Sequence, residues 1–387
     1  MTTNTYICNY RTAKKVLTSL YQRRVPVYIE GPSGIGKTSL VREICLEQGA
    51  ELVPPLILSG MEPYELKGLP NFSKDADGTP IVKYTRPDFF PYRKEKPQVI
   101  FLDELPNAQP ALQTPIYQLV LENRIGPHQL PQDTWVVAAG NIADDKAMLY
   151  EIQGPLLKRF VVLRMVPEID CWIEDFAIPN KIHPDLIAFF KVKPAFFDIS
   201  MDPRKDELDE IITPNPRSWV KVSDSLYNDD PEVQQYIISG CVGERAYMEL
   251  KATLEEIKDL PPINKLLELS AKNDFDGLHK LLPKKQAGLW GMVYNLIATC
   301  KDLKSVQKVV TLLVQVSEMD IDYAPETVNY AISSIYQLCT SKTPQLQVKP
   351  TDLVKIPHLR EYLDKNGDVL TNYANSQNTS KDKLAKV

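Results

Sequence analysis

A glycine-rich stretch near the N-terminus has the residue types and spacing that bind phosphate. The pattern G-x-x-x-x-G-K-[ST] is matched by Gly31, Pro32, Ser33, Gly34, Ile35, Gly36, Lys37 and Thr38, with Ser39 next. Its glycines let backbone N–H groups turn toward phosphate oxygens, and a helix that starts here adds the positive end of its dipole. Lys37 would reach the β- and γ-phosphates of a nucleotide, and the Thr38 hydroxyl would bind Mg²⁺. A glycine-rich turn with an accidental lysine is the alternative, and the strand and helix patterns on either side argue against it.

Two acidic residues follow a later apolar run. The run Val-Ile-Phe-Leu (99–102) leads directly into Asp103 and Glu104. A buried strand would hold these carboxylates at the edge of a sheet where ligands bind in open α/β folds. Asp103 is then a candidate Mg²⁺ ligand, and Glu104 would orient and deprotonate an attacking water. A strand that merely ends in a solvated acid pair is the alternative, and the phosphate-binding pattern upstream favours the catalytic interpretation.

Three further polar residues lie at predicted element ends. Asn141 follows the apolar run WVVAAG and could hydrogen-bond the γ-phosphate or the water; an Asn that starts a turn is the alternative. Arg159 lies at a helix-to-strand junction, where its guanidinium could face outward as an arginine finger or form a surface salt bridge. Arg217 follows Pro216, which suits the first turn of a helix, so Arg217 would point away from its own core.

These side chains need a framework, and residues 1–165 have the pattern of a sheet with helices. Short runs rich in Val and Ile occur at 25–30, 54–59, 98–104, 134–141 and 160–166. They lack strict alternation, which is typical of strands buried on both faces of a parallel sheet. Helical patterns lie between them at 10–23, 37–48, 109–123 and 146–158. The alternation predicts a doubly wound α/β domain, interrupted at 60–97 by an insertion that carries a hairpin.

Beyond residue 166 the strand pattern gives way to helical patterns. Helices are predicted at 183–191, 216–227, 231–257, 262–270, 275–281, 288–300, 303–317 and 325–340. We therefore expect the second half to be all-α. The polar, weakly patterned residues from about 366 onward predict a mobile tail.

Composition limits the class of function. The chain has 387 residues and a net charge of −5, which excludes a strongly basic protein that coats nucleic acid. No apolar run is long enough to span a membrane, and we expect no signal peptide. The six cysteines form no CxxC pair, which favours reduced thiols and a cytoplasmic protein over a zinc site. The basic residues beside the first helix, Lys14, Lys15, Arg23 and Arg24, are interpreted as a solvated face.

Taken in order, the motifs resemble those of the AAA+ ATPases, and more closely those of the MoxR branch within the helix-2-insert clade. GPSGIGKTS resembles Walker A, VIFLDELPNA Walker B, WVVAAGN sensor 1, LLKRF the arginine-finger segment and NPRSW sensor 2. SGMEPYELKGLPNF…YTRPDFFP looks like the insertion in the second helix, and ENRIGPHQLPQDTW like the hairpin before sensor 1. The resemblance covers residues 10–265, and the helices beyond match no family pattern.

The resemblance implies a division of the chain into parts. Residues 1–166 would form the AAA+ P-loop core, an α/β unit with a five-stranded parallel sheet and the insertion at 60–97. Residues 167–265 would form a linker and an α-helical lid. Residues 266–365 would be an additional C-terminal all-α region, and 366–387 a flexible tail.

It also implies a role for each candidate residue. The loop from Gly31 to Ser39 would bind ATP, with Thr38 and Asp103 as ligands of Mg²⁺ and Glu104 as the catalytic base. Asn141 would be sensor 1, and Arg217 would read the γ-phosphate from the lid. Arg159 would act in trans on the ATP of the neighbouring subunit, with Lys158 and Arg164 as alternatives for that role.

The implied function is that of an ATP-hydrolysing remodeller or chaperone of the MoxR type. An arginine that acts in trans implies a homo-oligomer, and the family implies a hexameric ring. The ring would remodel or activate a protein partner, such as a protein with a von Willebrand factor A domain. A nucleic-acid motor or loader is the alternative, and the acidic balance without a basic, aromatic-rich stripe argues against it. A non-enzymatic scaffold is a third hypothesis, which would have no need of a general base at Glu104.

Overall fold

The computed structural model describes most of the chain in two compact units. The described residues are 6–90, 95–141, 150, 152–199, 212–258 and 260–340, together with 346, 348, 350–353, 355, 356, 359, 360 and 362–366. One unit comprises Met1–Glu168 and the other Ile169–Val387.

The first unit is built on a parallel sheet of seven strands. They are β1 (Tyr6–Cys8), β2 (Val27–Glu30), β3 (Glu51–Leu52), β4 (Leu56–Ile57), β7 (Gln98–Asp103), β10 (Trp135–Gly140) and β11 (Val161–Met165). The order across the sheet is β1-β11-β2-β10-β7-β3, and β4 also pairs with β7. Because β3 and β4 pair with successive parts of β7, they act as one interrupted edge strand. The predicted α/β parallel sheet is confirmed, but it has seven strands rather than five, because the short strands β1 and β3 were not predicted.

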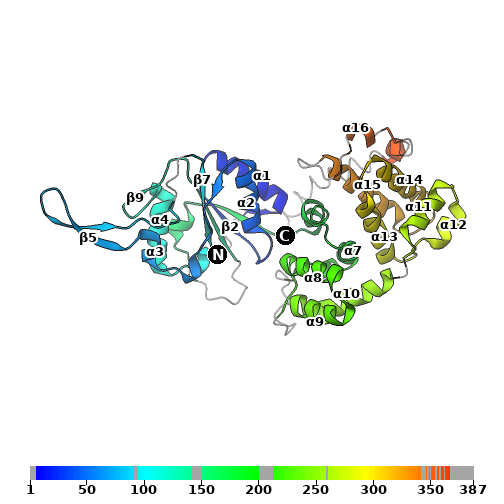
Figure 1. The fold of residues 1–387 in the computed structure, drawn as a ribbon, viewed down its shortest axis with the longest axis horizontal. Helices are drawn as coiled ribbons and strands as arrows, with labels where there is room; N and C mark the ends of the chain where they lie inside the picture. Colours follow the sequence, from blue (N-terminus) through cyan, green and yellow to red (C-terminus); the bar gives the residue numbers. More distant parts are fainter. Residues whose placement is uncertain are drawn as a thin grey trace. The chain divides into compact units, whose positions relative to one another are not determined.

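Helices cover both faces of this sheet, as Figure 1 shows. They are α1 (Tyr10–Gln22), α2 (Lys37–Glu47), α3 (Pro63–Lys67), α4 (Pro110–Glu122) and α5 (Gly154–Leu157), with 3-10 turns η1 (Leu58–Gly60) and η2 (Leu105–Asn107). Val27 and Ile29 of β2 pack with α1 and α2, whereas Tyr28 between them packs on the α4 side. Both faces of the central strands β2, β7 and β10 are buried, which explains the near-continuous apolar runs of the sequence there. The described part of the predicted helix 146–158 is helical only at α5.

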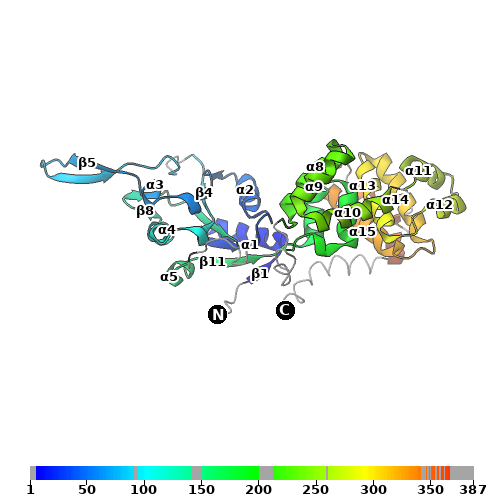
Figure 2. The same ribbon diagram turned by 90° about the horizontal axis from the view of Figure 1, so that it is seen from below.

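The predicted insertion at 60–97 contains a hairpin that projects from the unit. Strands β5 (Pro70–Lys74) and β6 (Pro80–Tyr84) pair antiparallel, and Figure 2 shows them extending away from the sheet. A second short hairpin, β8 (Arg124–Ile125) with β9 (His128–Gln129), lies in the predicted stretch before β10. The side chain of Phe72 on β5 is 83% exposed, so the projecting hairpin contributes little to the core.

The second unit is all-α in its described residues (Figure 2). Its elements are α6 (Ile169–Trp172), the π-helix η3 (Ile173–Ala177), α7 (Pro184–Val192), the 3-10 turn η4 (Pro194–Phe196), α8 (Pro216–Asn228), α9 (Pro231–Val242), α10 (Glu244–Ile257), α11 (Ile263–Ala271), α12 (Phe275–Leu281), α13 (Gln286–Thr299), α14 (Leu303–Ser317), α15 (Ala324–Thr340) and α16 (Pro350–Leu353). One continuous hydrophobic core extends from Ile173 to Tyr362. Residues 367–387 of the predicted tail lie outside the described residues.

One predicted helix is wrong in its extent. The pattern over 231–257 predicted a single helix, but α9 ends at Val242 and α10 begins at Glu244. Gly243 between them has φ of 86°, a backbone conformation that L side chains rarely adopt and that no helix residue has. Among the described residues, no helix is both long enough and apolar enough to cross a membrane.

Candidate functional site

The phosphate-binding pattern forms a tight loop between β2 and α2. Gly34 and Gly36 have φ of 83° and 94°, which glycine adopts without steric cost. A Cβ at Gly31 would lie 2.5 Å from the carbonyl oxygen of Met165, so the first glycine is required by close backbone approach. Helix α2 begins at Lys37, so its free N–H groups and positive dipole end face the loop. The loop therefore has the geometry that binds an anion.

Lys37 is held inside this loop. Its side chain is only 7% exposed, and its Nζ donates hydrogen bonds to the carbonyl oxygens of Gly31 and Pro32 at 2.8 and 2.9 Å. Nζ also donates to Oδ1 of Asn141 at 2.8 Å. A buried ammonium needs acceptors on several sides, and here two backbone carbonyls and one amide oxygen supply them. Lys37 and Asn141, distant in sequence, are thus brought together by a hydrogen bond.

The two acids lie at the end of β7, next to Thr38. Oγ1 of Thr38 lies 3.5 Å from Oδ2 of Asp103, and the other carboxylate oxygen accepts a hydrogen bond from the Glu104 N–H at 3.0 Å. Glu104 has φ of 58° and ψ of 39°, a left-handed conformation that is uncommon for residues other than glycine. Such conformations concentrate at functional sites, where the surrounding structure holds them. The Thr38 hydroxyl and the Asp103 carboxylate are oxygen donors of the kind that Mg²⁺ prefers.

Strand pairing explains why these residues meet. In β10, Gly140 pairs with Glu30 of β2, and Ala138 pairs with Leu102 of β7. The three strands run parallel, so the residues that follow them emerge at the same edge of the sheet. This edge carries the loop after β2, the acids at the end of β7 and Asn141 after β10, which matches the general position of ligand sites in open α/β sheets.

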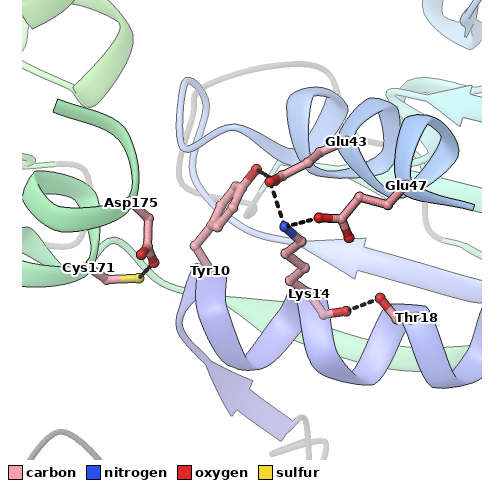
Figure 3. Close-up of polar contacts among 7 residues, drawn as sticks. All are labelled: Tyr10, Lys14, Thr18, Glu43, Glu47, Cys171 and Asp175. Atoms are coloured by element: carbon pink, nitrogen blue, oxygen red, sulfur yellow. Dashed lines mark hydrogen bonds and ion pairs between the residues drawn. The ribbon is translucent and has the colours of Figure 1, made fainter. Parts of the chain in front are cut away.

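A polar cluster fastens α1 to α2 beneath the loop, as Figure 3 shows. Lys14 forms ion pairs with Glu43 and Glu47 at 2.5 and 3.0 Å, and the Tyr10 hydroxyl donates to Glu43 at 2.9 Å. The ring of Tyr10 lies 3.5 Å from the position that a Cβ of Gly36 would take. Burial lowers the pKa of Lys14, but the hydrogen bonds and charges of the two glutamates outweigh it and raise that pKa above its usual value. Lys14 is therefore partly exposed and ion-paired, whereas Lys15 and Arg23 of the predicted solvated face are exposed.

Arg159 lies at the opposite edge of the sheet from this site. Strand β11 runs parallel to β2, with Val161 opposite Val27 and Arg164 opposite Glu30. Arg159 precedes β11, whereas the phosphate loop follows β2, so the length of β2 separates them. At about 3.3 Å per residue, that strand alone spans roughly 10 Å. Arg159 is therefore poorly placed to reach the phosphates of its own subunit.

The two alternatives to Arg159 differ in their surroundings. Arg164 lies within β11, and its Nε is 3.8 Å from a carboxylate oxygen of Glu30. Lys158 is exposed at the end of α5. Among the described residues, no carboxylate pairs with Arg159, so the surface salt bridge considered from the sequence does not form within that part of the chain.

Arg217 belongs to the second unit. Helix α8 begins at Pro216 as predicted, and its N-terminus is closed by a reciprocal pair of hydrogen bonds between Asn215 and Ser218. Arg217 is exposed in the first turn of this helix. Its role at the nucleotide stays a prediction.

Residues 26–160 match the family model described as AAA domain (dynein-related subfamily). Among solved structures, the chain is similar to a protein of Cytophaga hutchinsonii ATCC 33406 that is described provisionally as an ATPase, with 13% identity over 78% of this chain and 74% of that chain and a TM-score of 0.30. It is also similar to NtrX from Brucella abortus, with 15% identity over 62% of this chain and 50% of that one and a TM-score of 0.31. The complex of NtrX with ADP gives 13% identity, coverage of 86% and 67%, and a TM-score of 0.32. No curated protein matches the chain.

Proposed function

We propose that this chain, an AAA+ ATPase whose AAA domain covers residues 26–160, hydrolyses ATP at the interfaces of a ring of identical subunits. The observation that carries the ATPase assignment is the convergence of Lys37, Asn141, Thr38 and Asp103 at the carboxyl edge of the sheet. If the glycine-rich turn were accidental, we would not expect an ammonium, an amide, a hydroxyl and a carboxylate to converge around one loop.

The residues at this edge divide the work of hydrolysis. The loop N–H groups bind the phosphate oxygens, and Lys37 binds them by exchanging the carbonyl oxygens of Gly31 and Pro32 for phosphate oxygens. Together they hold the γ-phosphoryl group for in-line attack. Glu104 holds the attacking water and takes its proton as the water oxygen bonds to the γ-phosphorus. The bond from the γ-phosphorus to the bridging oxygen breaks, which releases ADP and phosphate. Asn141 donates from its amide nitrogen to the γ-phosphate or the water, because its oxygen already accepts from Lys37.

Thr38 and Asp103 are the residues that would hold Mg²⁺. Their oxygens lie 3.5 Å apart at the edge of the phosphate loop, and both are hard donors of the type that this cation requires. When bound there, the ion neutralises charge on the β- and γ-phosphate oxygens.

The proposed ring follows from the place of Arg159. It lies at the amino edge of the sheet, away from the phosphate loop of its own subunit, so a neighbouring subunit's ATP is the site it could complete. An arginine supplied across an interface stabilises charge in the transition state. The proposal includes a hexamer of the MoxR type, with Arg217 sensing the γ-phosphate from the helical unit. The work of the ring would be to remodel or activate a protein partner, for which a von Willebrand factor A domain protein is one candidate.

The first test replaces the proposed base. Glu104→Gln removes the proton acceptor but keeps the size of the side chain, so we expect ATP binding to persist while turnover falls by about 10²- to 10⁴-fold. Binding is measured by fluorescent-nucleotide titration, and turnover by phosphate release. Glu95→Gln, at an exposed carboxyl in the same unit, is the matched control and should behave as the unmodified protein.

Lys37→Ala completes this test, because it removes the ammonium that would contact the phosphates and should abolish binding as well as turnover. Normal turnover in Glu104→Gln would overturn the assignment of the site. Turnover that depends on DNA or RNA and falls steeply with salt would instead support the nucleic-acid motor.

A further inference from the structure

The guanidinium of Arg159 lies over an aromatic ring. Its Cζ is 4.3 Å from the centroid of the Tyr117 ring, and Nη1 donates a hydrogen bond to the carbonyl oxygen of Pro155 at 2.6 Å. Tyr117 lies on α4, the helix that follows the Asp103–Glu104 pair, whereas Pro155 lies on α5. A cation placed over an aromatic face at this distance is attracted by the negative charge of the ring face. Arg159 is thus fixed by a partner from each helix.

The same helix α4 also fixes the backbone that leads to Arg159. Oε1 of Gln113, one turn before Tyr117, accepts a hydrogen bond from the backbone N–H of Gln153 at 3.0 Å. Leu156 of α5 is 1% exposed and packs in the core cluster that includes Leu112 and Ile116 of α4. The segment that carries Arg159 is therefore attached to α4 by a hydrogen bond and by apolar packing, and Tyr117 lies on the same helix.

These contacts leave the charge of Arg159 unneutralised. The structure pairs it with no carboxylate among the described residues, and its Nε is buried without a hydrogen-bond partner. A buried guanidinium N–H that lacks an acceptor is unusual, because the N–H groups of a buried arginine normally donate hydrogen bonds to carboxylate or carbonyl oxygens. An aromatic ring can orient a guanidinium without occupying the N–H groups that would bind phosphate.

We propose that Tyr117 is the positioning residue for Arg159, an aromatic platform that orients the guanidinium before it meets the γ-phosphate of the neighbouring subunit. The inference rests on the proposed function, because it assigns a platform to an arginine that acts in trans. Arginine has many rotamers, and ordering its side chain in advance reduces the conformational entropy that is lost when the phosphate binds. Replacing the ring should therefore lower the rate of the chemical step and leave the affinity for ATP nearly unchanged.

The test separates the two sides of an interface. A donor subunit carries Glu104→Gln, so it can supply Arg159 but cannot hydrolyse its own ATP. An acceptor subunit carries Arg159→Ala, so it keeps its catalytic base but has no arginine to supply. Each alone should be inactive. A mixture should regain activity, because the arginine of the donor completes the site of the acceptor.

Tyr117→Leu is then placed in one subunit at a time. In the donor, we expect kcat of the mixture to fall about five- to tenfold with little change in KM. In the acceptor, the same change should cause no comparable loss, because that subunit has no Arg159 side chain for the ring to hold. Tyr117→Phe in the donor keeps the aromatic face and should retain most of the activity.

Each other result contradicts one of the proposals. An equal loss from Tyr117→Leu in donor and acceptor would show that the ring merely stabilises α4 and α5, and no loss in the donor would show that the ring does not matter; both overturn the inference alone. A mixture that stays inactive with Tyr117 intact would overturn the proposed action in trans, and with it the inference.

Discussion

The neighbours of a single side chain determine what it can do, and Asn141 illustrates this. Lys37 can only donate hydrogen bonds, so the atom of Asn141 that faces it must be the amide oxygen. The amide nitrogen is then available as the donor, which is the group that a γ-phosphate or a water would accept. The orientation of a proposed catalytic amide thus follows from the charge of the lysine beside it.

Gly140, the residue before Asn141, controls the position of Asn141 through close packing. A Cβ at residue 140 would lie 2.4 Å from Oη of Tyr28 and 2.5 Å from Cδ of Pro106. Burial, aided by the charge of Glu30, raises the pKa of Tyr28, so its hydroxyl stays protonated. We expect Gly140→Ala to cost about 1–3 kcal/mol of stability through overpacking. It should also lower turnover roughly ten- to a hundredfold by displacing Asn141.

This prediction is measured by denaturant unfolding and by phosphate release. Gly60→Ala is the control in the same unit, because a Cβ there meets nothing within 4 Å. If the Gly140 and Gly60 variants turned over ATP equally fast, the close approach at residue 140 would have no bearing on the site.

At the scale of elements, local patterns predicted the helices well and short strands poorly. Helices α12 and α14 begin and end at the predicted residues, because their apolar spacing and polar ends are encoded locally. Strand β1 has three residues and β3 has two, which is too few to show any periodicity in the sequence. These segments are strands because they pair with β11 and β7, respectively. Gly243 interrupted a helical pattern through its backbone conformation rather than its hydrophobicity.

Some features of the candidate site could likewise be predicted from local sequence patterns, and others could not. The positions of Lys37, Asp103 and Asn141 were predictable, because Lys37 begins a helix, Asp103 ends a strand and Asn141 follows one, and the place of these elements in a parallel α/β sheet is known in advance. The stacking of Arg159 on Tyr117 and the contact of Tyr10 with Gly36 were not, because they join elements through side-chain packing that leaves no spacing in the sequence. An aromatic residue on α4 looks like any core residue until the arginine opposite it is placed.

One helix end in the second unit should respond to pH. His183 caps α7, and its Nδ1 accepts a hydrogen bond from the backbone N–H of Asp185 at 3.3 Å. Burial lowers the pKa of His183 below the usual 6.5, although the charge of Asp185 acts in the opposite direction. As the pH falls through 6.5, the unfolded chain therefore binds a proton that the folded chain does not. The contribution of His183 to stability is full above that pH and declines below it, until the lower folded-state pKa is reached.

Hydrogen exchange of the α7 amides, corrected for the intrinsic effect of pH, measures this decline. His183→Asn keeps a side-chain oxygen that can cap the helix and does not titrate, so its protection should change less as the pH is lowered. A variant and an unmodified protein with identical pH profiles would show that His183 does not control the end of the helix.

At the scale of the molecule, the sheet separates two halves of one proposed active site. The phosphate loop, Asp103 and Asn141 lie at its carboxyl edge, and Arg159 lies before β11 at its amino edge. A monomer would hold both halves without being able to join them, whereas in the proposed ring the amino edge of one subunit would meet the carboxyl edge of the next. Such head-to-tail contacts close into rings when the rotation between subunits allows it.

Activity should therefore depend on protein concentration. With ATP and Mg²⁺ present, we expect the ATPase rate per subunit to rise steeply over the same range in which light scattering shows a larger particle forming. Arg159→Ala should still assemble, because the substitution removes a catalytic group rather than the bulk of an interface, yet its rate per subunit should stay low at every concentration. A rate per subunit that is constant while the scattering remains that of a monomer would mean that the site is complete within one chain. The catalytic arginine would then have to be sought elsewhere, and Arg217 at the start of α8 would be the first residue to replace.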